Sequence, residues 1–265
     1  MPVDGGGFRI RPDVELANAS DVGCERTQNE DYFLYIEPRD DDEFHHRGRL
    51  ILVADGIGGR NGGEVASRLA AETVRDIFLE TADGEDSRSV LIAGFQAAHR
   101  AILDIAGETP ELRGMGTTCC AAILRNGQMY YGHAGDSRIY LIRGGRAEPL
   151  TEDHNVVARM VRDGLIGEED ARHHPQRNVL TAALGLDSES VAGDFPVDPL
   201  ALLAGDIILL CTDGLHGLVS DEEFSLTMAE QSLSDACREL VALAKFRGGP
   251  DNITVQLLRV RHVES

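Results

Sequence analysis

The sequence predicts an α+β layered fold in which antiparallel β-sheets are covered by helices. Segments rich in β-branched and aromatic residues occur in clusters, and two long segments with apolar residues at helical spacing lie between those clusters. The strict alternation of strands and helices that indicates a doubly wound parallel sheet is not found. The 265 residues can bury a core without disulfides, and no repeat or linker divides them. We therefore expect residues 1–265 to form a single domain.

The elements follow in chain order. Strands are expected at 14–19, 32–36, 50–54, 117–124, 129–133, 138–143, 207–211 and 253–260. Helical patterns start at Gly63 and Ser87 and recur at 155–163, 221–229 and 234–245. The acidic segment 40–43 and the two histidines that follow it are predicted to form a solvated loop. Residues 155–176 are predicted to form an exposed, mobile flap.

Charge and cysteine content narrow the class of protein. The chain has 25 Lys and Arg against 45 Asp and Glu, a net charge of −20, which disfavours nucleic-acid and membrane-surface binding. Five cysteines without CxxC spacing argue against a disulfide framework or a zinc site. The N-terminal residues lack the apolar region of a signal peptide, and apolar runs such as 207–211 are too short to span a bilayer. These features predict a cytoplasmic protein.

Five aspartates follow predicted strands or occupy turns beside them. A single Asp-Gly pair after a strand is usually only a turn. Five such sites are expected to converge, because strand ends of one layered fold share a common rim. A cluster of oxygen ligands suits Mg²⁺ or Mn²⁺. The five residues are Asp31, Asp55, Asp136, Asp213 and Asp251.

The glycine-rich segment 55–64 suggests a phosphate-binding loop but does not fit one. A GxGxxG match from Gly56 requires glycine at position 61, where the chain has Asn61, and the segment lacks the lysine of a Walker loop. We expect these glycines to let the backbone approach a metal, with the Gly56 carbonyl free to bind it.

Taken together, the motifs resemble the metal-dependent (PPM, type 2C) protein serine/threonine phosphatases of bacteria. The resemblance runs from about residue 20 to 256. It is carried by SDVG at 20–23, Arg26, NED at 29–31, VADGIGG at 53–59, MGTT at 115–118, GDSR at 135–138, TEDH at 151–154, LCTDG at 210–214 and DN at 251–252.

This resemblance implies an αββα sandwich of two central antiparallel sheets flanked by helices, with a metal cluster at one end. It assigns the phosphate-holding role to Arg26 and makes Asp55 a carboxylate that bridges two metals. The remaining implied ligands are the Gly56 carbonyl beside Asp55, Asp213 and Asp251 on one metal, Glu30 and Asp31 near the second through water, and Asp136 with Asp213 on a third.

The implied activity is hydrolysis of phosphoserine and phosphothreonine by a hydroxide that bridges two Mn²⁺ or Mg²⁺ ions. The implied partners are phosphorylated proteins, the targets of a cognate serine/threonine kinase, and the enzyme is expected to be a monomer. Ile57 stands where animal members carry a histidine, so the general acid is unassigned, and Gly217 stands where many members have an aspartate. His216 is either a proton donor or a structural residue, and general preference favours the second.

Two alternatives remain open at this point. One is a non-catalytic scaffold of the same fold that binds phosphoproteins. The other is a nucleotide-binding domain built on the glycine-rich segment. The complete set of candidate ligands together with Arg26 counts against the first, and the failed phosphate-loop motifs count against the second.

Overall fold

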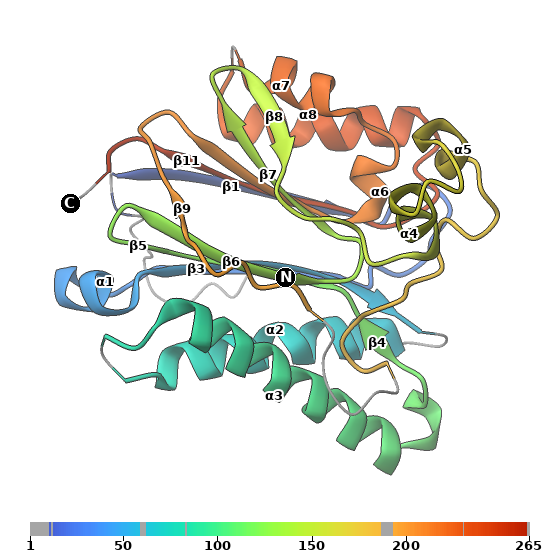
Figure 1. Cartoon of the computed structure of the whole chain (residues 1–265), viewed down its shortest axis with the longest axis horizontal. Helices are drawn as coiled ribbons and strands as arrows, with labels where there is room; N and C mark the ends of the chain where they lie inside the picture. The colour runs from blue at the N-terminus through green and yellow to red at the C-terminus, as the bar shows by residue number, and fades with distance from the viewer. Residues whose placement is uncertain are drawn as a thin grey trace.

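The computed structural model describes residues 11, 13–58, 62–82, 84–186, 193–229 and 231–263. Two antiparallel sheets lie face to face, and a pair of helices covers the outer face of each (Figure 1). The predicted αββα sandwich is confirmed.

Each sheet joins strands from distant parts of the chain. The first sheet has the order β1 (Val14–Asp21), β11 (Ile253–Val260), β10 (Ile207–Cys211), β7 (Arg138–Arg143) and β8 (Arg146–Pro149). The second has the order β2 (Asp31–Ile36), β3 (Arg49–Ile57), β5 (Cys119–Arg125), β6 (Gln128–Ala134) and β9 (Leu200–Ala201), and the short β4 (Gly116–Thr117) pairs with β3.

Three apolar layers hold the sandwich together. Side chains alternate along the buried strands, as the two-residue period of a strand requires. On β3, for example, Leu50 and Leu52 face the helices while Ile51 and Val53 face the other sheet. The outer layers are closed by α2 (Gly62–Glu80) and α3 (Ser87–Glu108) on the second sheet, and by α7 (Asp221–Met228) and α8 (Leu233–Phe246) on the first.

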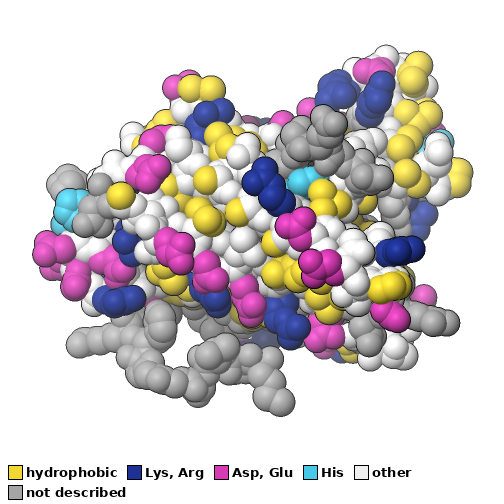
Figure 2. Space-filling model, turned by 90° about the horizontal axis from the view of Figure 1, so that it is seen from below, with side chains coloured by type: hydrophobic (Ala, Val, Ile, Leu, Met, Phe, Trp, Pro, Cys, Tyr) yellow, Lys and Arg dark blue, Asp and Glu magenta, His cyan; other side chains and the backbone are white. Residues whose placement is uncertain are grey.

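Among the helices that the structure describes, α3 alone is long and apolar enough to cross a membrane, judged by length and composition. Its inner face packs on α2 and on the second sheet. Its outer face carries the exposed charges of Arg100, Asp104 and Glu108. Figure 2, which views the molecule from the α2–α3 side, shows charged side chains of both signs spread among scattered apolar ones. These features are those of an amphipathic core helix.

The acidic segment 40–43 differs from its prediction as a loop, because it begins helix α1 (Asp41–Arg47). The Asp40 side chain caps this helix by accepting a hydrogen bond from the Glu43 N–H at 2.9 Å. Phe44 supplies one buried side chain on the inner face. Acidic residues in the first turn and basic ones in the last match the helix dipole.

The flap segment 155–176 contains two short helices, α4 (Val156–Arg162) and α5 (Glu168–Arg172). The helix predicted at 155–163 is therefore confirmed, whereas α5 was not predicted. Both helices lie toward the same end of the sandwich as α6 (Asp213–His216) (Figure 1). Mobility of this segment stays a prediction.

The apolar layer between the sheets should dominate stability. Leu210 is fully buried in that layer, whereas Leu226 on α7 is 68% exposed. We expect Leu210→Ala to lower the free energy of unfolding by about 2–5 kcal/mol. The same change at Leu226 should alter it by about 0.5 kcal/mol or less. Urea denaturation measures both, and equal effects would contradict this account of the core.

Candidate metal centre

The five predicted aspartates converge at one end of the sandwich. Asp31 and Asp55 are directly opposite each other on neighbouring strands. The other three lie in segments next to strands β7, β10 and β11 of the opposite sheet, which all pair at this end. Asp136 lies between β6 and β7, Asp213 begins α6 directly after β10, and Asp251 lies just before β11. The expectation that these carboxylates share a rim is confirmed.

Threonine hydroxyls position the carboxylates. Thr212 donates from Oγ1 to Asp31 Oδ2 at 3.0 Å, and its Oγ1 also accepts the backbone N–H of Thr254 at 3.0 Å. Thr118 Oγ1 accepts the backbone N–H of Asp55 at 2.9 Å. The Thr212–Asp31 bond links the two sheets, and the other two bonds fix strand ends within one sheet each.

Two carboxylate oxygens of the cluster have no hydrogen-bond partner although they are buried, Oδ1 of Asp31 and Oδ1 of Asp213. A buried unpaired polar atom is costly, and a buried unpaired charge more so. Oxygen ligands at several converging carboxylates are what hard divalent cations bind. The residues present therefore fit Mg²⁺ or Mn²⁺.

The electrostatics of the cluster lead to the same conclusion. Burial, followed by the charges of Asp31 and Asp213, holds the pKa of Asp55 well above its ordinary value. Burial raises the pKa of Asp31 to about 7 and that of Asp213 to about 6, with further upward contributions from neighbouring carboxylates. Burial also raises the pKa of Asp136. Only nearby positive charge would let all these groups ionise together.

Close backbone contacts explain part of the glycine-rich segment. A Cβ added at Gly56 would lie 2.2 Å from the Gly63 carbonyl oxygen, so the start of α2 could not approach the end of β3. A Cβ at Gly63 would lie 2.6 Å from Glu30 Oε2. Positions 59–61 of this segment lie outside the described residues.

Arg26 lies beside the cluster on the loop between β1 and β2. Its Nη2 donates to Asp251 Oδ2 at 2.7 Å, and its side chain is 53% exposed. This hydrogen bond raises the pKa of Arg26. Burial raises the pKa of Glu30, which ends the same loop, while the charge of Arg26 opposes that shift.

Asn252 holds this loop in place, a role that the sequence analysis did not assign. Its Oδ1 accepts the Glu30 N–H at 2.8 Å, and its Nδ2 donates to the carbonyls of Val22 at 3.0 Å and Gln28 at 2.9 Å. The available signal was its position directly after Asp251, where an amide can bond both backbone donors and acceptors.

His216 has the geometry of a structural residue. Its Nε2–H donates to the Asp136 carbonyl at 2.8 Å. Burial, with a smaller contribution from Arg138, lowers its pKa to about 4, so the ring is neutral near pH 7. The proton on Nε2 is therefore engaged in supporting the backbone at Asp136, as the preferred interpretation of this histidine requires.

The raised pKa values predict an unusual pH dependence for metal-free protein. Folded Asp31 and Asp213 retain protons up to about pH 7 and 6, whereas unfolded aspartates lose them near 3.8. The folded chain thus binds more protons than the unfolded chain in this window, so its free energy of unfolding falls as pH rises. We expect the melting temperature in EDTA to decrease from pH 5 to 7.

Asp213→Asn provides the control, because it removes one of these titrating groups. Its melting temperature should depend less on pH over the same range, and Mn²⁺ should stabilise the unaltered chain more at pH 7 than at pH 5. Differential scanning calorimetry measures each. Parallel pH profiles for the two proteins would contradict the assignment.

The sequence of this chain is similar to those of known metal-dependent phosphatases. The sequence model of the family described as Protein phosphatase 2C matches residues 36–245. The serine/threonine phosphatase stp of Listeria welshimeri is 35% identical over 243 residues, covering 90% of this chain and 93% of that protein.

Two solved structures share the fold. The serine/threonine phosphatase of S. agalactiae has a TM-score of 0.84 at 32% identity, covering 93% of this chain and 99% of that one. The catalytic domain of the serine/threonine phosphatase PstP, solved in complex with two manganese ions, has a TM-score of 0.79 at 32% identity, covering 94% and 99%. The resemblance predicted from the motifs is confirmed, and this chain belongs to the protein phosphatase 2C family.

Proposed function

We propose that the carboxylate cluster carries out the protein serine/threonine phosphatase activity of this family, with Mn²⁺ or Mg²⁺ as cofactor. The substrates are phosphorylated proteins, and the reaction is hydrolysis of phosphoserine and phosphothreonine esters. The observation that carries the proposal is the convergence of five aspartates, two of them with unpaired buried oxygens, next to one exposed arginine. The manganese complex of the related PstP domain supports the choice of cofactor.

The ligand roles that we propose are those implied by the resemblance to the family, and the convergence of the residues supports them. Asp55, whose pKa is influenced by all four other aspartates, would be the carboxylate shared by two cations, with the Gly56 carbonyl as a further ligand. We assign Asp213 and Asp251 to one cation, Glu30 and Asp31 to the second, and Asp136 with Asp213 to a third. When bound, the divalent cations offset the carboxylate charge, attract phosphate oxygens and acidify a water molecule.

Arg26 binds the phosphoryl group of the substrate in this proposal. A guanidinium presents paired donors that match phosphate oxygens, and the half-exposed position of Arg26 lets substrate reach it. Its bond to Asp251 keeps it at the edge of the cluster. There it stabilises the charge that develops on the phosphoryl oxygens during hydrolysis.

No residue is given the role of general acid. Ile57 has no titratable group, and the Nε2 proton of His216 is bound to the Asp136 carbonyl. His216 instead supports the backbone that carries Asp136.

The remaining expectations concern the setting of the enzyme. We propose one catalytic domain, acting as a monomer in the cytoplasm on targets of a cognate serine/threonine kinase. All five cysteines are free, which agrees with a reducing compartment. The complete ligand set beside Arg26 gives no support to a non-catalytic scaffold, and the family match gives none to a nucleotide-binding domain.

Metal removal tests the cofactor. Protein stripped with EDTA should lose activity on a phosphothreonine peptide and regain it with Mn²⁺. Asp213→Asn should lower kcat at least about a hundredfold, because substitution of groups that merely support metal ligands already costs up to that much. Asp104→Asn, an exposed change on α3, should leave kcat unchanged. Full activity after chelation would exclude the mechanism.

Arg26→Ala tests phosphate binding. We expect kcat/KM for the phosphopeptide to fall about a hundredfold, the scale of losing one donor to a developing oxyanion. The affinity for Mn²⁺ should not weaken, since Arg26 competes with metal for Asp251. Arg238→Ala, a change at an exposed residue of α8, serves as control. Unchanged kcat/KM in the Arg26 variant would remove this role.

A further inference from the structure

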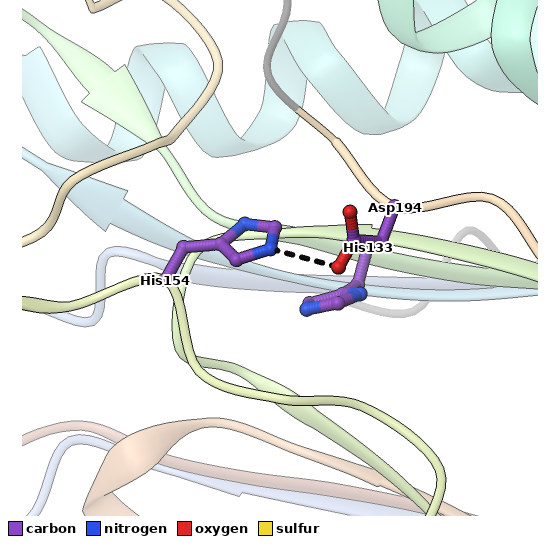
Figure 3. A group of neighbouring side chains, drawn as sticks. All are labelled: His133, His154 and Asp194. Carbon is purple, nitrogen blue, oxygen red and sulfur yellow. Dashed lines mark hydrogen bonds and ion pairs between the residues drawn. The ribbon is translucent and has the colours of Figure 1, made fainter. Parts of the chain in front are cut away.

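A second group of potential metal ligands lies outside the carboxylate cluster. It comprises His133 near the end of β6, His154 before α4, and Asp194 ahead of β9, one residue from each of three segments (Figure 3). Each offers one ligand atom, and the three atoms lie within 4.8 Å of one another. The carboxylate cluster shares none of these residues.

Backbone hydrogen bonds place all three side chains. His133 and Asp194 exchange two of them, at 3.0 and 2.9 Å, so their side chains emerge from directly paired positions. The N–H of His154 donates to the Gly135 carbonyl at 2.9 Å, and its own carbonyl accepts from Thr181 at 2.8 Å. The two imidazole rings stack with centroids 4.4 Å apart. The group is therefore held together before any ligand arrives.

The protonation of His133 suits metal binding. Its Nε2–H donates to the Glu152 carbonyl at 2.8 Å, which leaves the lone pair of Nδ1 for another partner. Burial lowers the pKa of His133, with a smaller contribution from the charge of His154, so the ring is neutral near pH 7. A backbone carbonyl that orients the second ring nitrogen is a regular feature of metal-bound histidines.

The two hydrogen bonds of the His154 ring are long. Its Nδ1 accepts from the Gly135 N–H at 3.3 Å, and its Nε2 lies 3.3 Å from Asp194 Oδ2. Both distances exceed the usual 2.7–3.2 Å range of N–H···O bonds. The side chain of Asp194 is 67% exposed, so water competes for this hydrogen bond and Asp194 gains little from it.

We propose that His133, His154 and Asp194 form a second metal site that binds Zn²⁺ in preference to Mg²⁺. Two imidazoles and one carboxylate are a common ligand set for Zn²⁺ and leave a coordination position open. Mg²⁺ instead prefers oxygen ligands throughout. The cysteine spacing that argued against a zinc site is not relevant here, because this site uses no thiolate.

Gly135 connects the proposed site to the carboxylate cluster. When Zn²⁺ binds His154 at Nε2, the proton held there moves to Nδ1. That nitrogen can no longer accept the Gly135 N–H, and Gly135 precedes Asp136. Occupation of the site thus alters the hydrogen bonding of the turn that presents Asp136.

Calorimetric titration with ZnCl₂ tests the proposal on the full chain after chelator removal, with excess Mg²⁺ present to occupy the carboxylate cluster. We expect one Zn²⁺ per chain that Mg²⁺ does not displace. Asp194→Asn and His154→Gln should each weaken its binding at least about tenfold. His173→Gln, a change at an exposed histidine of the flap, should not, and neither should Asp213→Asn.

Three results would overturn the proposal. They are the lack of Mg²⁺-resistant Zn²⁺ binding by the unaltered chain, unchanged affinity in both site variants, and loss of that binding in Asp213→Asn, which would place the zinc in the carboxylate cluster. Circular dichroism verifies that each variant is folded, and visible absorption of bound Co²⁺ reports nitrogen ligation independently of affinity. None of these results bears on the Mn²⁺ requirement of the phosphatase reaction, so the two proposals fail separately.

Discussion

Mutual repulsion among buried carboxylates is the constraint around which this molecule is organised. Burial raises the pKa of Asp55, Asp31 and Asp213, and each is raised further by at least one neighbouring aspartate. Oδ1 of Asp31 and Oδ1 of Asp213 lack hydrogen-bond partners. Such an arrangement is unfavourable by itself and becomes favourable when divalent cations bind. The same interaction therefore links stability, pH and catalysis.

A layered sandwich is well suited to maintaining that arrangement. The carboxylates come from both sheets, so their separation depends on how the sheets pack and not on any local segment. The apolar layer around Ile51 and Leu210 fixes this packing. Strand register matters equally, because the opposition of Asp31 and Asp55 would be lost by a shift of one residue, which also reverses every side chain on the strand. The packing of the apolar core thus determines the positions of the carboxylates at the rim.

The sequence predicts the features that depend on regular periodicity. Apolar runs locate β10 and β11 at their observed bounds, and helical spacing locates α2 and α3 within a residue of their observed starts. It also predicts the five converging aspartates. It predicts 117–124 as one strand. In the structure the strand is interrupted at Thr118, whose hydroxyl accepts the Asp55 N–H. That contact spans 63 residues, so no local pattern contains it.

Other features that escaped prediction have the same origin. Helix α1 depends on a side-chain cap and a single buried phenylalanine, too little for a periodic signal. Asn252 bonds to a loop more than 200 residues away, and Asp194 meets His133 of β6 through an isolated bridge outside the regular strands. Asn252, Asp194 and His133 are ordinary polar residues in the sequence. They acquire a role only because the tertiary fold pairs their segments.

The turn between β6 and β7 shows how two different cation chemistries can coexist a few residues apart. His133 precedes Asp136 by three positions, yet the first belongs to a group with two imidazoles and the second to a group with oxygen ligands alone. The type of ligand determines which cation each group binds, because nitrogen ligands favour Zn²⁺ while Mg²⁺ requires oxygen. Gly135 contacts His154 through its N–H and is joined covalently to Asp136. A change in the ligand bound at His154 therefore alters the hydrogen bonding of the peptide unit next to Asp136.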